Sequence, residues 1–403
     1  MINEPKKTII FVSPETQYEN LGDLIIIKVL LKNLRNYGKL VINDRNLPQW
    51  FCQELEIQES ERASKHGKKF ISVMLNYAIK NLLQWQQNNI YYVLTPGHRF
   101  SKSISNVLEY FIYLVQKIKD LIILALLKTF NFRICRFGVS IGPFSKIDEF
   151  AEKLQSEFMY FYSVRDTKSE NYAQKIGINK VKIFPDLAWL LKIPNTSSSL
   201  IKSNDEYVIF SFRESTHPLD KSNTYRNHLF SVLDEIVDIV CIQWQKKLLI
   251  SYQVDLDFEF CQEISDRYKE KYPVIFINER INSQKMYDLY SQAYMIFSNR
   301  LHVLMFGTIC GSIPVAVVDK AKHDKIIGIY SDAGLMPQVI DISSSENILD
   351  RLSKMAANTD LIKQELALCI QRYQNSGNEI FQDVMTDDSQ STSLRTIENV
   401  VNS

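Results

Sequence analysis

The chain has 403 residues, which is long for a single hydrophobic core, so two domains are expected. Its 47 basic and 46 acidic residues give a formal net charge of +1, and this balance offers no electrostatic reason to expect a nucleic acid partner. Six cysteines form no CxxC pair, and three of them lie in apolar runs, which predicts reduced residues of a cytoplasmic protein.

Strand and helix patterns alternate through the first half of the sequence. Apolar runs predict strands at 7–12, 90–94, 133–141, 158–164 and 181–184, and helical periods predict helices at 23–37, 103–129, 147–156 and 167–176. The segment 193–206 is rich in Ser, Asn and Pro and has no period, which predicts a linker.

The alternation restarts after this linker. Strands are predicted at 207–212, 247–251, 274–277, 294–297 and 313–318, and helices at 227–240, 258–268, 283–291, 301–310 and 325–332. Two such blocks predict an α/β chain of two doubly wound, Rossmann-like domains that face a cleft, as in GT-B-like transferases. We expect domains at 1–195 and 207–375, the linker at 196–206 and a polar tail at 376–403.

The segment 107–132 is the most apolar helical stretch, but Lys117, Lys119, Asp120 and Lys128 interrupt it, so it does not qualify as a membrane span. A long, mostly buried helix is the first interpretation. The alternative is a helix whose outer face touches a membrane and brings the protein to lipid-linked substrates. In that case we expect a cytoplasmic protein that associates with the membrane.

Residues 298–314 carry the strongest functional signal. Arg300 and His302 directly follow the predicted strand 294–297 and open the predicted helix 301–310, with Gly311 as its expected C-cap. Such a strand end favours an anion, Arg adds a planar fork for phosphate or carboxylate, and His titrates near neutral pH. The pattern predicts an anion site with a proton donor; alternatively, both side chains only cap the helix.

Short motifs occur in a fixed order around that segment. They are NLGD at 20–23, GVSIGP at 138–143, VRDTKS at 164–169, PDLA at 185–188, RLH at 300–302, GSIP at 311–314, and Lys325 followed by GL at 334–335. In this order, over residues 8–335, the chain resembles the polysaccharide pyruvyl transferase family. The resemblance implies transfer of a pyruvyl group from phosphoenolpyruvate to a sugar of a polysaccharide or lipid-linked glycan, as a cyclic ketal.

That chemistry needs cationic anchors for the phosphate and the carboxylate of the donor, and acid and base groups with pKa values near neutrality. The resemblance implies that His302 transfers a proton and that Arg300, with Leu301, binds the donor. Asp23 is a second catalytic candidate, as a base.

Arg165, Arg213 and Lys325 also lie near predicted strand ends and are candidate donor ligands. Each has a plainer interpretation: Arg165 holds its loop through Asp166, Arg213 is a surface residue, and Lys325 opens a solvated helix. Asn20 is a candidate acceptor ligand, with the alternative that residues 20–23 only shape a turn and cap the next helix.

One segment departs from the family. Where members often carry a glycine run after the strand that 90–94 resembles, this chain has a loop from Thr95 to Phe100. Its His98 and Arg99 add side-chain donors, and we expect them to bind the acceptor. The departure leaves open whether the donor and the acceptor are those of typical members.

No spacing typical of a metal site appears, so we expect no metal or other cofactor, with phosphoenolpyruvate as a substrate. An inverting GT-B glycosyltransferase that uses a nucleotide sugar is the runner-up function. A third hypothesis is a non-catalytic protein that binds a glycan or another partner on the same scaffold.

Overall fold

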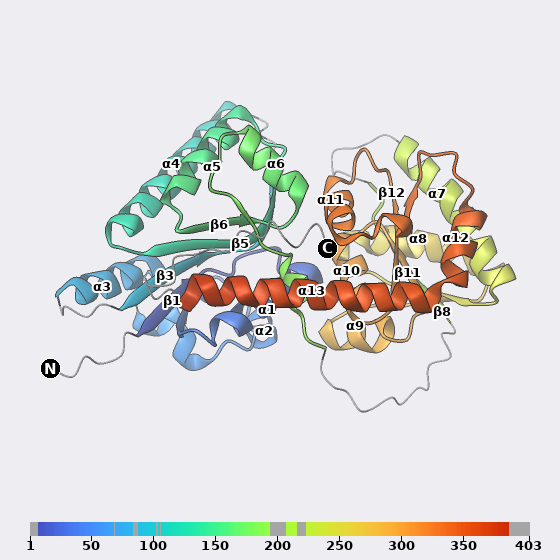
Figure 1. Ribbon diagram of the computed structural model, residues 1–403, viewed down its shortest axis with the longest axis horizontal. Coiled ribbons are helices and arrows are strands. Elements are labelled where there is room, and N and C mark those ends of the chain that lie inside the picture. Colours follow the sequence, from blue (N-terminus) through green and yellow to red (C-terminus); the bar gives the residue numbers. More distant parts are fainter. Residues whose placement is uncertain are drawn as a thin grey trace.

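The computed structural model describes residues 7–67, 69–83, 88–101, 104, 106–193, 207–215 and 223–386. The expected linker at 196–206 lies outside these residues. The chain forms two parallel sheets with helices packed against them, one in each half (Figure 1).

The N-terminal half is built on a seven-stranded sheet of order β2-β1-β3-β5-β6-β7, with β4 paired to β5. Its strands are β1 (Thr8–Val12), β2 (Lys39–Ile42), β3 (Asn89–Leu94), β4 (Gly97–Arg99), β5 (Arg133–Ile141), β6 (Phe161–Val164) and β7 (Lys182–Ile183). Its helices are α1 (Leu21–Leu34), α2 (Gln49–Glu54), α3 (Phe70–Leu83), α4 (Val107–Thr129), α5 (Lys146–Phe158) and α6 (Thr167–Lys175), with short turns η1 (Glu59–Glu61), η2 (Ala63–His66) and η3 (Leu187–Leu190).

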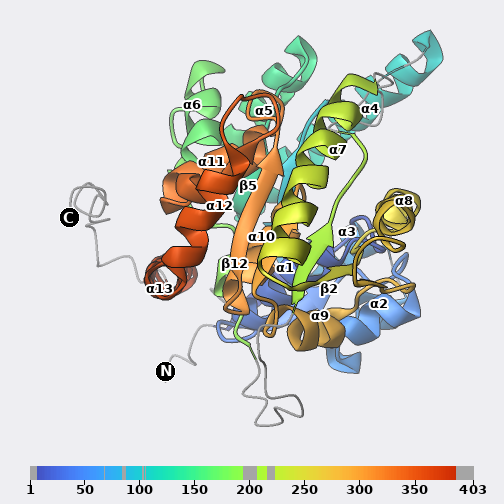
Figure 2. The ribbon, with the colours of Figure 1, turned by 90° about the vertical axis from the view of Figure 1, so that its right-hand side faces the viewer.

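The C-terminal half has a six-stranded parallel sheet of order β10-β9-β8-β11-β12-β13. The strands are β8 (Tyr207–Ser211), β9 (Lys247–Ile250), β10 (Val274–Phe276), β11 (Met295–Ser298), β12 (Ile313–Val318) and β13 (Val339–Asp341). Around them lie α7 (Asn223–Asp238), α8 (Phe258–Tyr268), α9 (Ser283–Tyr290), α10 (Leu301–Ile309), α11 (Asp324–Ala333), α12 (Ile348–Ala357) and α13 (Thr359–Thr386), with turns η4 (Ile239–Gln243), η5 (Asp255–Asp257) and η6 (Met336–Gln338). Figure 2 shows α8 and α11 on opposite sides of this sheet.

The strand order of the C-terminal sheet is that of the dinucleotide-binding Rossmann fold, counted from β8. Its order reverses between β8 and β11, which pair in parallel from Ile209 and Ile296 to Ser211 and Ser298. Ligands of open α/β sheets bind beyond the carboxyl ends of strands at such a reversal. Arg213 follows β8 and Arg300 follows β11, so both lie at this point.

Helix α13 corrects the expected polar tail. Residues 376–386 continue the helix to Thr386, and its last turns pack on the N-terminal half, as Figure 1 shows. The Phe381 ring stacks on Phe137 with centroids 4.5 Å apart, and Tyr91 donates a hydrogen bond to the carbonyl of Val384 over 3.2 Å. The segment was predicted to be a polar tail because most of its residues are polar. Its apolar residues at 380–381 and 384–385 nevertheless recur at helical spacing and pack against the core. Residues 387–403 lie outside the described part.

Two further expectations differ from the structure. Residues 97–99, expected in a loop, form β4, which pairs with the last residues of β5 because β5 extends beyond the end of β3. Helix α4 is not mostly buried, since Leu124 and Leu127 are its only buried residues. No helix among the described residues is long and apolar enough to cross a membrane.

Candidate active site

His302 lies in the first turn of α10, directly after β11, and packs against the N-terminal half. A Cβ atom placed on Gly22 would lie 2.0 Å from the His302 Nδ1 atom, so the absence of a side chain at Gly22 makes room for the imidazole. On the other side, the imidazole stacks on Phe306. The contact joins the start of α1 to the start of α10 and brings the two halves together at this histidine.

The His302 imidazole is largely buried, and its Nε2 atom has no hydrogen-bond partner among the described residues. The nearest carboxylate oxygen in an ion-pair geometry belongs to Asp186, 4.0 Å from Nε2. Burial lowers the pKa of His302, and the charges of Asp186 and Asp23 only partly oppose this effect. The ring is therefore neutral near pH 7, and Nε2 is available to a ligand.

Arg165 and Asp186 form a buried ion pair beside His302. Asp166 caps α6 by accepting from the Ser169 amide, while the Arg165 side chain turns away from it and donates to Asp186 and to Ser140 Oγ. Asp186 also accepts from the Ala188 amide at the start of η3. Since Arg165 and Asp186 are both almost completely buried, each depends on the other for charge compensation.

Lys325 and Arg213 bring positive charge to the same place without a carboxylate partner. No hydrogen bond or ion pair involves the Lys325 ammonium among the described residues, and burial together with the charges of Arg165 and Arg213 lowers its pKa to about 7. Burial and the charge of Arg300 lower the pKa of Arg213 to about 10, and its Nε atom is buried without a hydrogen-bond partner. The two cations repel each other and their neighbours, and a bound anion would relieve this repulsion.

Arg300 has a partner that the sequence does not indicate. Its guanidinium pairs with Asp257, at the end of η5, while its amide donates to Ser298 Oγ over 2.9 Å. In the sequence, Asp257 directly precedes α8 and looks like a helix-capping residue. Arg300 lies 43 residues further along the chain, so no local pattern indicates that the two side chains form a pair. Asn299 was missed for the same reason: it exchanges hydrogen bonds of 2.9 Å with the backbone of Arg213 and so fixes the end of β8 against that of β11.

The start of α1 contributes Asn20 and Asp23. Asn20 is the N-cap of α1 and accepts from the Gly22 amide over 3.0 Å, which is the structural role considered for it. Asp23 accepts from Thr16 Oγ1 over 2.8 Å, and its charge influences both His302 and Lys325. Leu301, the first residue of α10, lies between the two candidate residues Arg300 and His302.

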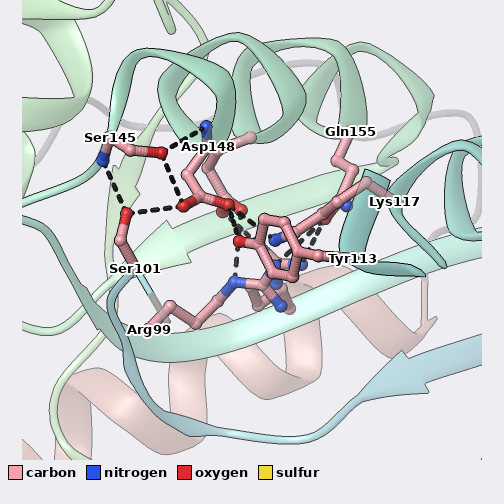
Figure 3. Close-up of polar contacts among 9 residues, drawn as sticks. Arg99, Ser101, Tyr113, Lys117, Ser145, Asp148 and Gln155 are labelled. Carbon is pink, nitrogen blue, oxygen red and sulfur yellow. Dashed lines mark hydrogen bonds and ion pairs between the residues drawn. The ribbon is translucent and has the colours of Figure 1, made fainter. Parts of the chain in front are cut away.

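His98 and Arg99 point to different surroundings, because successive side chains of a strand face opposite sides. His98 Nε2 lies 3.0 Å from the Gly142 carbonyl, and burial and the charge of Lys325 lower the pKa of His98 to about 3. Arg99 instead contacts α5, with Nε 3.1 Å from a Glu152 oxygen, as part of the polar cluster in Figure 3. The structure therefore places His98 near the cationic residues and Arg99 in a neighbouring cluster.

A cavity of about 230 Å³ opens beside this cluster. It is lined by His98, Arg99, Phe100, Lys117, Phe144, Asp148 and Glu152. Although burial raises the pKa of Asp148, hydrogen bonds from Ser101 and Tyr113 and the Lys117 ammonium hold it at about 2. The cavity is thus polar, with aromatic rings at its wall, and His98 is one of its lining residues.

The fold resembles several solved structures. Anabaena HepE in complex with UDP superposes with a TM-score of 0.59 at 12% identity, over 94% of this chain and all of that one. UDP-GlcNAc 2-epimerase from Neisseria meningitidis bound to UDP-GlcNAc gives 0.56 at 12% identity, over 94% and 100%. A glycosyltransferase from Rickettsia africae gives 0.51 at 12% identity, over 95% and 100%. No match to a curated protein was found.

These similarities confirm the predicted fold class, a GT-B-like α/β architecture of two doubly wound halves. The sequence match is more specific. The family model of polysaccharide pyruvyl transferase matches residues 20–319, which include His302, Arg300, Arg213 and Arg165. The chain belongs to the polysaccharide pyruvyl transferase family and is an enzyme of that type, a transferase that modifies polysaccharides.

Proposed function

We propose that the enzyme transfers a pyruvyl group from phosphoenolpyruvate to two hydroxyls of one sugar residue, in a polysaccharide or a lipid-linked glycan intermediate, and forms a cyclic ketal. One observation carries the proposal. A neutral, largely buried His302 lies among cations of which Arg213 and Lys325 have no carboxylate partner in the described residues. Phosphoenolpyruvate supplies both a phosphate and a carboxylate to such a site.

The donor would be bound by Arg213, Lys325 and the amide groups at the start of α10, with Arg300 held in place by Asp257. Arg165 adds positive charge from the N-terminal half, although Asp186 already neutralises it. Both anions of the donor then bind where the two halves meet, so the substrate contributes to their correct alignment.

The reaction requires three proton movements. The methylene carbon of phosphoenolpyruvate gains a proton, which makes the adjacent carbon electrophilic. One sugar hydroxyl attacks this carbon and loses its proton, the carbon–oxygen bond to phosphate breaks, and a second hydroxyl attacks and loses its proton. One proton thus enters the new methyl group, and the other leaves with the phosphate.

His302 and Lys325 suit these transfers because both have pKa values near or below neutrality. Neutral His302 accepts the proton of the attacking hydroxyl through its unpartnered Nε2. Protonated Lys325, whose pKa is about 7, is an acid of suitable strength for the methylene carbon. Asp23 influences both groups and is the alternative base.

The acceptor would enter from the side of β4. The cavity beside His98 has charged side chains and the rings of Phe100 and Phe144, which suit the hydroxyls and the apolar face of a sugar. His98 and Arg99 are its proposed ligands on the acceptor side, with Asn20 at the start of α1. No metal or other cofactor is part of this proposal, so activity should survive a metal chelator.

The test is phosphate release from phosphoenolpyruvate in the presence of a panel of pyranosides, with the wild type, His302→Ala and the control His228→Ala. His228 is exposed on α7, away from His302. Acceptor-dependent release that only His302→Ala abolishes is the expected result. No release from any acceptor, together with a rise in melting temperature caused by a nucleoside diphosphate, would instead favour the alternative, an inverting glycosyltransferase that uses a nucleotide sugar.

A further inference from the structure

Helix α4 exposes an unusual amount of apolar surface. Eight of its large apolar side chains are between 40% and 73% exposed: Val107, Leu108, Phe111, Ile112, Val115, Ile118, Ile122 and Leu126. Single exposed apolar residues are common, but a run of them along one helix marks an interaction surface. We call these eight residues the α4 stripe.

The stripe follows the helical period, since positions 108, 111, 115, 118, 122 and 126 recur at intervals of three and four residues. The opposite side of α4 contacts the protein. Leu124 and Leu127 belong to an apolar cluster shared with α3, and Tyr113 and Lys117 bind Asp148 of α5. Figure 1 shows α4 beside α5, above the N-terminal sheet. The stripe therefore faces outward because the polar and buried sides of the helix are already engaged.

Neighbouring residues extend the same character. Ile79, Leu82 and Leu83 at the end of α3 are exposed, and α3 packs in the same apolar cluster as α4. Phe100 is also exposed, and it lines the cavity together with Lys117 of α4. Apolar side chains are thus exposed at the end of α3 and at the cavity wall as well as along α4.

The charges on α4 favour an anionic partner. At roughly 100° per residue, Lys119 lies beside the stripe, whereas Glu109 and Asp120 lie on the side of the helix turned away from it. Lys119 is exposed. An apolar stripe with a lysine beside it and carboxylates behind it is the pattern of a helix that lies in the interface of an anionic bilayer.

We propose that the α4 stripe binds the surface of an anionic lipid bilayer, with the helix axis in the plane of the membrane. Binding itself does not depend on which reaction the enzyme catalyses. Its consequence does rest on the proposed function: the cavity beside His98, which Lys117 of α4 helps to line, would then lie close to the membrane, within reach of a glycan acceptor carried on a lipid.

The test is cosedimentation of the full chain with vesicles of phosphatidylcholine alone or with 30 mol% phosphatidylglycerol, a composition of about one anionic lipid in three. The test variant combines Phe111→Gln, Val115→Gln, Ile118→Gln and Ile122→Gln. The control combines Leu256→Gln and Leu368→Gln, which are more exposed than the four test residues but lie in the C-terminal half. We expect binding of the wild type and the control to the anionic vesicles, and a partition coefficient at least about ten-fold lower for the test variant.

Two further measurements separate the possible outcomes. Replacing Lys119 by Gln should weaken binding and reduce its dependence on salt. The four-Gln variant should keep its melting temperature and its activity on a soluble acceptor, so a defect in membrane binding is distinguishable from a failure of the proposed reaction. The proposal would be refuted if the wild type did not bind vesicles, or if the four-Gln variant bound them equally well. It would also be refuted if the wild type were a dimer that the four substitutions dissociate without changing vesicle binding.

Discussion

At the scale of single residues, the closest functional contact is that between Gly22 and His302. The imidazole occupies the space that a side chain at position 22 would need, with 2.0 Å between His302 Nδ1 and an added Cβ. The glycine in the NLGD motif is thus required by a histidine 280 positions later, and not by the turn that precedes it. Its backbone needs no unusual conformation, since Gly22 is a regular residue of α1.

We predict that Gly22→Ala displaces the His302 ring and lowers kcat/KM about 100-fold, which is the usual effect of moving a catalytic group by about 1 Å. Steady-state kinetics of phosphate release measure this effect. A double-mutant cycle with His302→Ala supplies the control for stability. In a protein that already carries His302→Ala, the methyl group added by Gly22→Ala has no ring to displace. Gly22→Ala should therefore lower the melting temperature less there than in the wild type.

The pKa values of His302 and Lys325 predict that kcat/KM is highest below about pH 7. Burial lowers the pKa of His302 from its ordinary 6.5, so kcat/KM should fall only below that pH, as the base becomes protonated. The pKa of Lys325 is about 7, so kcat/KM should also fall above pH 7 as the free enzyme loses this positive charge. In Lys325→Arg the cation persists at all accessible pH values but cannot donate a proton, so kcat/KM should be lower throughout and the alkaline limb should move upward. An alkaline limb unchanged in this variant would exclude Lys325 as its origin.

At the scale of elements, η3 connects the two halves through Asp186. This residue caps η3, pairs with buried Arg165 of the N-terminal half and lies 4.0 Å from His302 of α10. The same turn packs against α1, α10 and α13. One short segment therefore supports the positions of an arginine and of the histidine.

We predict that Asp186→Ala lowers the free energy of unfolding by about 3 kcal/mol, because it leaves the Arg165 guanidinium buried without a counter-charge. Urea denaturation measures the change. Asp266→Ala is the matched control: it removes an exposed ion pair with Lys269 and should cost less than about 1 kcal/mol. Equal losses in the two variants would mean that the Arg165–Asp186 pair does not stabilise the fold.

At the scale of the whole molecule, the candidate site is divided between the two sheets. Asp23, His98, Arg165 and Asp186 come from the N-terminal half, and Arg213, Arg300, His302 and Lys325 from the other. Direct contacts hold the halves together, including the Lys168–Asp324 ion pair and a 2.7 Å hydrogen bond from the Thr167 amide to Asp332. An anion bound among the cations should therefore stabilise the molecule as one unit.

We predict that phosphoenolpyruvate at about 100 times its Kd raises Tm by roughly 3–5 °C, from the mass-action gain of about 2.7 kcal/mol. Arg213→Ala should lose most of this shift, because it removes a cation with no carboxylate partner. His228→Ala should keep it. Thermal unfolding with and without the ligand provides the measurement, and a full shift in Arg213→Ala would place the donor elsewhere.

Much of this molecule follows from its sequence, but unevenly. The strand of residues 133–141 and the helix of residues 258–268 are predicted with their observed bounds, because apolar residues recur there with a clear period. Residues 376–386 were predicted wrongly from composition, since the polar residues of α13 outnumber the apolar residues that pack on the N-terminal half. The partners Asp257 and Asn299 were not predicted, because nothing in their local sequence refers to Arg300 or Arg213.

The sequence by itself determined the α/β class, the positions of most strands and the order of the family motifs, since these depend on local period and residue type. The tertiary structure alone decided which charged groups are paired. It buried Arg165 against Asp186, paired the half-buried Arg300 with Asp257, left Arg213 and Lys325 without a carboxylate among the described residues, and turned His98 and Arg99 in different directions. The reason is physical: burial and the distance between charges set the chemistry of each group, and both arise only when segments far apart in the chain meet.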